Sequence, residues 1–345
     1  MLFPEKMDCQ EVGVVFENRD KVVRLGRMVV FWGIFVFLLY GGSVVTAPKF
    51  NTAEAGMEGR DIPSAGVMAE PEDSLDVIVL GDSESHSAVS PMVLWKNHGI
   101  TSFVCGQSGQ RAVEAYYMMK KVLTMQKPKV VILETDLFYH SREWQREWNL
   151  AIERTARYYF PMVQYHNRWK GLTAGDWKGL PFEGRRDVNK GFLPSRDIRP
   201  YKGGSYMVKT EDREALKGTV TFWTDRLVEL CRKEGIHLLL VGTPTPKNWD
   251  YRRHNGVSDY AAKKKLPFLD MNLLEKELNM DWDRDSRDEG DHLNTYGAEK
   301  VSRYLGDYLK ANYGLTDHRK GEGAKRWWKD FESARRWKEV AIQKD

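Results

Sequence analysis

The chain has 345 residues and a formal net charge of +4 at pH 7, from 53 basic and 49 acidic residues. This near balance gives no electrostatic case for a nucleic-acid partner, and a mean hydropathy of −0.56 excludes a protein with many membrane spans. Hydrophobic residues make up 41% of the chain, which is enough for a sizeable core. Three cysteines are too few for a disulfide framework, so the core itself must hold the fold together.

An uncharged apolar segment, residues 28–47, stands near the N-terminus and is long enough to cross a bilayer as a helix. Four basic residues and one acid directly precede it. The positive-inside rule therefore places residues 1–27 in the cytoplasm and the main part of the chain outside the cell membrane. The alternative is a signal peptide cleaved after Ala47. The length of the apolar run, and the position of Pro48 directly after such a cut, favour an uncleaved anchor.

Residues 48–74 are rich in Gly, Pro, Ala and Glu without apolar periodicity, which is typical of a tether. Beyond them, short apolar runs typical of buried strands alternate with helical patterns. Strands are expected at 76–80, 101–105, 129–133, 237–241 and 267–270, and helices at 90–98, 111–125, 211–234 and 295–312. The alternation predicts an α/β domain, with a parallel sheet covered by helices on both faces and ligands at the carboxyl ends of the strands.

Two segments depart from this alternation within and after the expected domain, residues 75–315. Residues 141–206 are polar, basic and rich in aromatic residues. As an insertion after the third strand, they are expected to cap the ligand edge or to form a small core of their own, and the two roles are compatible. Residues 316–345 form a basic amphipathic tail, which suits either an anionic membrane surface or a docking site on the domain.

A serine in the setting of a nucleophile follows the first expected strand, in the sequence Gly81-Asp82-Ser83. At a strand-to-helix turn, a serine exposes its hydroxyl at the top of a parallel sheet, and its backbone N–H can point to a forming oxyanion. Gly-Asp-Ser is also an ordinary turn sequence. After the second strand, Ser108-Gly109 offers backbone amides that could approach the same oxyanion, with a plain turn as the alternative.

A histidine with neighbouring acids precedes the last expected helix. His292 can take the proton of a serine hydroxyl and return it later, while a carboxylate orients its ring. The candidate acids are Asp288, Glu289 and Asp291, and their spacing alone does not choose among them. Asp291 would need an unusual turn to meet the adjacent ring, which favours Asp288. The alternative is a surface histidine beside a helix cap.

Together and in this order, these segments resemble the SGNH (GDSL-like) hydrolase superfamily over about residues 75–312. The resemblance implies a three-layer α/β/α, flavodoxin-like fold with Ser83 as the nucleophile and His292 as its base. It also implies an oxyanion hole built from the backbone amides of Ser83 and Gly109. The family's acid usually stands three residues before the histidine, which is the position of Glu289 here.

The third segment of the family pattern differs in this chain. The family usually has an asparagine whose amide donates to the oxyanion, whereas Asp136 stands near that position here. An ionised aspartate cannot donate a hydrogen bond. Either Asp136 is protonated, this donor is missing, or the residue has another role.

Within the superfamily, the arrangement is similar to a membrane-anchored, extracytoplasmic branch that includes the D-alanyl transfer protein of teichoic acid synthesis and the alginate O-acetylation proteins. This similarity implies a serine esterase or O-acyltransferase of the cell envelope. Its partners would be the membrane, a cell-surface polymer or acyl donor and an envelope acyltransferase. The alternatives are a non-catalytic polymer-binding or scaffold protein, which the Asp136 departure supports, and a lipase or thioesterase variant.

No cofactor is required by this chemistry, and no metal is expected. The acids between Asp281 and Asp291 lack the spacing of a calcium-binding loop, and no cysteine pair is present. A further histidine, His254, follows the fourth expected strand and is interpreted as a surface residue of a basic loop.

Overall fold

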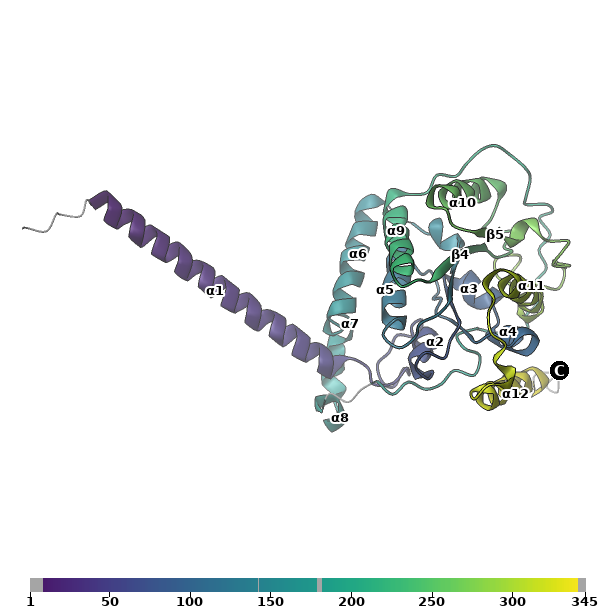
Figure 1. Ribbon diagram of the computed structural model, residues 1–345, viewed down its shortest axis with the longest axis horizontal. Helices are drawn as coiled ribbons and strands as arrows, with labels where there is room; N and C mark the ends of the chain where they lie inside the picture. The colour runs from purple at the N-terminus through teal and green to yellow at the C-terminus, as the bar shows by residue number, and fades with distance from the viewer. Residues whose placement is uncertain (1–8, 142, 179–181, 341–345) are drawn as a thin grey trace, which may run out of the picture. The chain divides into compact units, whose positions relative to one another are not determined.

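The computed structural model describes residues 9–141, 143–178 and 182–340 (Figure 1). The ends of the expected cytoplasmic segment and basic tail, residues 1–8 and 341–345, lie outside the described residues. The chain divides into two compact units. The smaller combines residues 1–47 with 156–180, and the larger combines residues 48–155 with 181–345.

A five-stranded, fully parallel sheet forms the centre of the larger unit. Its strands are β1 (Val77–Leu80), β2 (Ser102–Val104), β3 (Val130–Glu134), β4 (His237–Gly242) and β5 (Phe268–Asp270). The strand order β2-β1-β3-β4-β5 is the flavodoxin-like order, and its direction of winding changes between β1 and β3. All five expected strands and the predicted parallel sheet are therefore confirmed.

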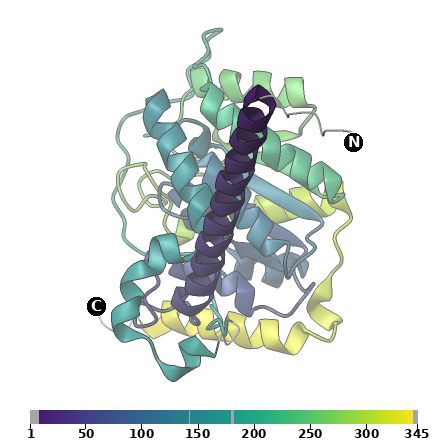
Figure 2. The ribbon, with the colours of Figure 1, turned by 90° about the vertical axis from the view of Figure 1, so that its left-hand side faces the viewer.

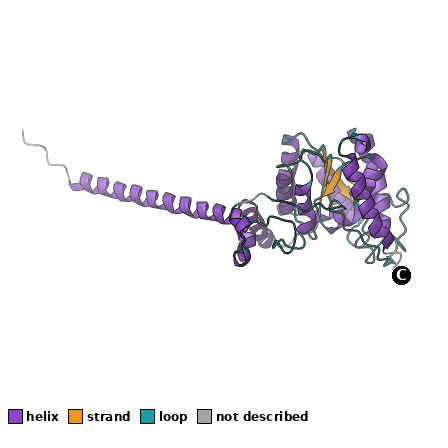
Figure 3. Ribbon diagram, turned by 90° about the horizontal axis from the view of Figure 1, so that it is seen from below, coloured by secondary structure: helices purple, strands orange, loops and turns teal. Residues whose placement is uncertain are grey.

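Helices cover both faces of the sheet because side chains along each strand alternate between the faces (Figure 3). In β1, Val77 and Val79 pack on one helical layer and Ile78 and Leu80 on the other. The first layer is α3 (Ser83–Ala88), α4 (Pro91–His98) and α11 (Thr295–Tyr313), and the second is α5 (Ala112–Val122), α9 (Gly218–Lys233) and α10 (Tyr251–Lys264). The predicted three-layer α/β/α class is confirmed, although the α10 segment was expected to begin as a loop.

The aromatic insertion begins with α6 (Trp144–Tyr159), and the part of this helix in the larger unit lies against the second helical layer. Arg154 pairs with Glu114 of α5 at 2.9 Å, and the ring of Trp148 lies 5.4 Å from that of Phe222 in α9. The later part of the insertion instead lies alongside the loop that precedes α11 and contains His292, which is called the histidine loop below. Arg199 forms backbone hydrogen bonds with residues 286 and 289 of that loop, at 3.0 and 3.1 Å.

Residues 48–74 contain two short helices, α2 (Ile62–Ala65) and η1 (Gly66–Ala69), and Ala65 and Val67 are buried. Near the other end of the chain, α12 (Ala324–Val340) packs on α4. Trp327 of α12 is 2% exposed and stacks on Trp95 at 5.2 Å between ring centroids. The remaining short 3₁₀ helices of the larger unit are η2 (Asp136–Phe138), η4 (Met271–Leu273) and η5 (His318–Lys320).

The smaller unit contains α1 (Cys9–Thr46), drawn in dark purple in Figure 2, together with α7 (Met162–Tyr165), η3 (His166–Gly171) and α8 (Ala174–Trp177). The part of α1 from Lys21 to Thr46 is long and apolar enough to cross a membrane. Arg168 binds the carboxyl end of this helix, donating to the carbonyl oxygens of Thr46 and Ala47 at 2.6 and 2.9 Å. A cation there satisfies carbonyls that have no partner within the helix.

Candidate active site

The Gly-Asp-Ser sequence forms the turn between β1 and α3, at the carboxyl edge of the sheet. Gly81 has a φ of 147°, and a Cβ there would lie 2.6 Å from the Cβ of Glu134 at the end of β3. Asp82 then begins the helix by accepting a hydrogen bond from the backbone N–H of Glu84 at 3.2 Å. Ser83 is therefore the first helical residue and is half-buried.

Two glutamines connect the loop after β2 to this turn by hydrogen bonds. The backbone N–H of Gln107 donates to the carbonyl of Gly81 at 3.1 Å, and the side chain of Gln110 accepts from the N–H of Gly81 at 3.0 Å. Gly106 allows the close approach, since a Cβ there would overlap the Ser85 hydroxyl. Gly109, the expected oxyanion donor, has a left-handed φ of 60° and open space where a Cβ would be.

His292 lies in the loop before α11 and is bound by Asp288. Its Nδ1 lies 2.6 Å from Asp288 Oδ2, and its backbone N–H donates to Oδ1 of the same carboxylate at 2.6 Å. Asp291 Oδ2 is 3.9 Å from Nδ1, and Glu289 is exposed, with its N–H donating to the carbonyl of Arg199. Of the three candidate acids, Asp288 is the one placed to orient the ring, and it leaves Nε2 as the free acceptor.

The carboxyl of Glu84 contacts both the serine and the histidine. The Ser83 hydroxyl donates to Glu84 Oε2 at 3.2 Å, whereas Nε2 of His292 lies 3.8 Å from Oε1 and is buried without a hydrogen-bond partner. Asn248, in the loop after β4, donates to Glu84 Oε1 at 2.8 Å and to Asp291 Oδ1 at 2.6 Å. Burial, followed by the charge of Asp82, raises the pKa of Glu84 well above its usual range.

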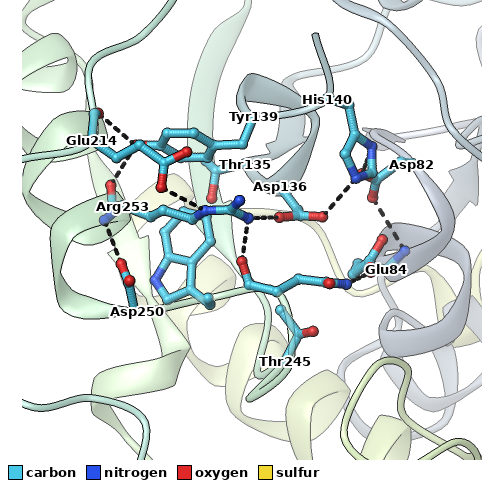
Figure 4. Close-up of polar contacts among 12 residues, drawn as sticks. Asp82, Glu84, Thr135, Asp136, Tyr139, His140, Glu214, Thr245, Asp250 and Arg253 are labelled. Atoms are coloured by element: carbon cyan, nitrogen blue, oxygen red, sulfur yellow. Dashed lines mark hydrogen bonds and ion pairs between the residues drawn. The ribbon is translucent and has the colours of Figure 1, made fainter. Parts of the chain in front are cut away.

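A second cluster of charged side chains surrounds Asp136, the residue that stands near the asparagine position of the family pattern (Figure 4). The ring of His140 is held between two fully buried carboxylates, with Nδ1 2.8 Å from Asp82 and Nε2 3.1 Å from Asp136. Arg253 of α10 donates to the other oxygen of Asp136 at 3.2 Å. Hydrogen bonds to Asp136 and Asp82 raise the pKa of His140 to about 10, so the ring is a cation at neutral pH.

This arrangement gives Asp136 a role as an ion-pair acceptor. Burial raises the pKa of Asp136, and the hydrogen bond from His140 opposes that rise. For Asp82, burial is the largest single influence and acts to raise the pKa, but the hydrogen bond and charge of His140, together with hydrogen bonds to Glu84 and Glu134, hold the pKa below its usual range. Both carboxylates form an ion pair with a cation, and Asp136 also accepts from Arg253, so Asp136 is not arranged as an oxyanion donor.

Within the described part of the chain, two groups of side chains bring carboxylate and imidazole atoms within 4.8 Å of one another, as a metal site would require. In Asp82, Asp136 and His140, the ring itself fills the space between the carboxylates. In Glu84, Asp291 and His292, the amide of Asn248 donates to both carboxyl groups and so occupies the place that a cation would need. Neither arrangement fits a bound metal as it stands.

The sequence interpretation did not identify Glu84, His140, Asn248 and Arg253. The sequence could have pointed to both Glu84 and His140, because Glu84 directly follows the serine and His140 stands four residues after Asp136. Asn248 and Arg253 come from a loop and a helix that only the fold brings to this edge. His254, by contrast, is bound to Asp270 at 2.7 Å and stacks on Phe268, away from this charged group.

No protein-family model and no curated protein matches the chain. Among solved structures, a putative acylhydrolase from Bacteroides fragilis is 12% identical and covers 73% of this chain and 95% of its own, with a TM-score of 0.36. A putative lipolytic protein of the G-D-S-L family from Desulfitobacterium hafniense is 16% identical and covers 68% of this chain and 98% of its own, with a TM-score of 0.37. A lipase/acylhydrolase from Enterococcus faecalis is 13% identical and covers 69% and 96%, with a TM-score of 0.35. Likenesses this distant assign neither a family nor an activity to the chain.

Proposed function

We propose that this protein is a membrane-anchored serine esterase or O-acyltransferase of the SGNH type, acting outside the cell on acyl groups of a cell-surface polysaccharide or teichoic acid-like polymer. The observation that carries the proposal is the hydrogen-bonded pair of His292 and Asp288 at the sheet edge where Ser83 begins α3. A serine, a histidine with a free Nε2 and an orienting carboxylate are the parts that acyl transfer through a covalent intermediate requires.

In the proposed reaction, the Ser83 hydroxyl oxygen attacks the acyl carbonyl and its proton passes to His292. Asp288 holds the ring by Nδ1 and stabilises the charged imidazolium. Backbone N–H groups of Ser83 and Gly109 are proposed to receive the negative charge of the tetrahedral intermediate. His292 returns its proton to the departing alcohol as the acyl-enzyme forms. The acyl group then passes to water in an esterase, or to a hydroxyl of the polymer in a transferase, and His292 moves the proton of that acceptor to the Ser83 oxygen.

The cellular setting of the proposal rests on the N-terminal helix and its flanking charge. The segment Lys21–Thr46 has the length and hydropathy of a membrane span. Basic residues precede its apolar part, which by the positive-inside rule directs the N-terminus to the cytoplasm and the larger unit outward. The polymer substrate follows from the resemblance of this anchor and the serine and histidine segments to envelope acylation proteins.

A second candidate function is a non-catalytic envelope protein that binds polymer or scaffolds an acyltransferase. Two observations favour it: the Ser83 hydroxyl donates to Glu84 and not to His292, and Asp136 is engaged by His140 and Arg253. A resting enzyme can show the first feature, since catalytic hydrogen bonds often form only with substrate bound.

A serine-reactive fluorophosphonate probe separates the two functions. The esterase proposal expects covalent labelling of the detergent-purified full chain and none of Ser83→Ala. Absence of labelling in the wild type, or equal labelling of the variant, would support the non-catalytic protein. Release of acetate from an acetylated polysaccharide, compared with hydrolysis of phospholipid and thioester substrates, then distinguishes the polymer esterase from a lipase or thioesterase.

A further inference from the structure

Glu84 lies between the nucleophile and its base. Its Oε2 accepts from the Ser83 hydroxyl at 3.2 Å, and its Oε1 is 3.8 Å from Nε2 of His292. We propose that the Glu84 carboxyl is a catalytic proton relay between Ser83 and His292. The inference rests on the proposed esterase function and adds a fourth participant to it.

The contacts hold the carboxyl in one orientation. Glu84 is 3% exposed, and Asn248 donates to its Oε1 at 2.8 Å. Nε2 of His292, which must accept the serine proton, is buried without a hydrogen-bond partner, and the Glu84 Oε1 atom lies 3.8 Å from it. A proton path from Ser83 to His292 therefore leads through Glu84 in this arrangement, with one oxygen of the carboxyl toward each residue.

The charges around Glu84 favour its neutral form. Burial disfavours the carboxylate, and the negative charge of Asp82, followed by that of Asp136, adds to this effect. The cations His140 and Arg253 are paired with Asp82 and Asp136, which reduces their compensation at Glu84. On the other side, the carboxylate of Asp291 shares the Asn248 amide with Glu84. A neutral carboxyl can accept a proton on one oxygen and donate one from the other.

The relay step balances in protons and bonds. The Ser83 O–H bond breaks as its oxygen bonds to the acyl carbon, and that proton moves to Glu84 Oε2. The proton on Oε1 moves at the same time to Nε2 of His292. Glu84 stays neutral with its proton on the other oxygen, and His292 becomes an imidazolium held by Asp288. Return of the protons by the same path supplies the leaving alcohol and leaves His292 neutral. Neutral His292 and Glu84 can then take the proton of the attacking water or acceptor hydroxyl and pass it to the Ser83 oxygen.

The test is Glu84→Gln in the full-length protein, with 4-nitrophenyl acetate as the substrate. An amide of the same shape can still accept from Asn248 but cannot exchange one proton for another between its two ends. We expect kcat to fall by about 10²- to 10⁴-fold, the range for loss of a general acid–base group, with little change in KM. The matched control is Glu289→Gln, the same change at an exposed carboxyl of the histidine loop, which should keep wild-type kcat.

The outcomes separate the relay from the proposed function. A wild type without turnover or fluorophosphonate labelling overturns the esterase, and the relay with it. An active wild type whose Glu84→Gln variant keeps kcat within about threefold overturns the relay alone, and shows that Ser83 turns directly to His292. If the variant does not fold, the acylation rate of the wild type in H₂O–D₂O mixtures decides. Two protons in flight give a curved dependence on deuterium fraction, and a straight line contradicts the relay.

Discussion

His140 joins two buried carboxylates, Asp82 and Asp136, that would otherwise repel each other at the carboxyl edge of the sheet. Neither carboxylate has exposed surface, so the imidazolium between them neutralises charge that water cannot reach. His140 follows Asp136 by one 3₁₀ turn, η2 (Asp136–Phe138), an irregular element without an apolar period. The sequence draws attention to Asp136. The ion pairs of His140 with both carboxylates depend on the fold, because only the fold brings Asp82 beside the ring.

Replacing His140 with glutamine should destabilise the larger unit by about 3 kcal/mol, the low end for breaking a buried ion pair because the ring is about one-third exposed. The pH dependence gives a second check. The pKa of His140 is raised to about 10, so its stabilisation is complete below its ordinary value near 6.5 and is lost as the pH rises through 10. Urea unfolding at pH 6, 8 and 10 should show this loss in the wild type but not in His140→Gln. Equal slopes with pH would contradict it.

Asp288 should matter to the rate far more than to the fold. An asparagine in its place can still accept from the backbone N–H of His292, but it no longer stabilises the charged ring. We expect Asp288→Asn to lower kcat for 4-nitrophenyl acetate by about 10²- to 10⁴-fold. Steady-state kinetics beside the Glu289→Gln variant provide the comparison. An equal loss in both variants would mean that the loop as a whole was disturbed, and would remove Asp288 from its orienting role.

At the scale of elements, β1 and β3 follow directly from the sequence because each is a short, continuous run that is buried on both faces. The start of α10 is harder to predict from the sequence, because Tyr251 and Arg252 follow a stretch with two prolines and show no apolar periodicity. Its N-terminal signal is Asp250, whose side chain accepts from the N–H of Arg253 at 3.0 Å. Arg253 therefore reaches Asp136 from a helix that the apolar pattern alone did not show.

The role of α12 also depends on tertiary contacts. Its apolar side chains would suit a membrane surface as well as a protein surface, and only the partner Trp95 decides between these for Trp327. Beside this stack, Lys190 is fully buried and pairs with Glu70 at 2.6 Å and Asp330 at 2.7 Å. An aromatic stack and a buried cation thus both hold α12 against the rest of the larger unit.

Truncating Trp327 to alanine should therefore cost about 3–5 kcal/mol of unfolding free energy, as for other large aromatic side chains removed from a core. Trp144, which is 69% exposed on α6, offers the matched control, and its alanine variant should change stability by about 0.5 kcal/mol or less. Both values can be measured by urea unfolding followed by circular dichroism. Indistinguishable midpoints for the two variants would show that α12 is not part of the cooperative unit.

At the scale of the whole molecule, the long apolar helix near the N-terminus is the feature that the averaged composition conceals. A mean hydropathy of −0.56 describes the chain as a whole, whereas the segment Lys21–Thr46 of α1 contains an 18-residue stretch with a mean hydropathy of 2.2. Length and composition predict that such a helix can cross a bilayer. Its orientation depends on the flanking charges and on insertion in the cell, so it calls for a measurement on intact cells.

The cysteines of the chain provide that measurement. Cys105 and Cys231 are buried, so a membrane-impermeant maleimide should leave them unmodified while the protein is folded. Cys9 precedes the apolar segment and reports on the N-terminal side. With the N-terminus in the cytoplasm, Cys9 should be labelled only after permeabilisation, whereas a cysteine in place of Lys127, whose side chain is 82% exposed, should be labelled in intact cells.

Each of the remaining labelling results would contradict a specific part of the proposed topology. Labelling of Cys9 but not of Lys127→Cys in intact cells would reverse the orientation and place the proposed esterase in the cytoplasm, away from cell-surface polymers. A mature protein without Cys9 would indicate cleavage of the apolar segment, which a mass measurement detects directly. With α1 intact and the larger unit outside, diffusion of the site is confined to the membrane surface, so the polymer must reach Ser83 there.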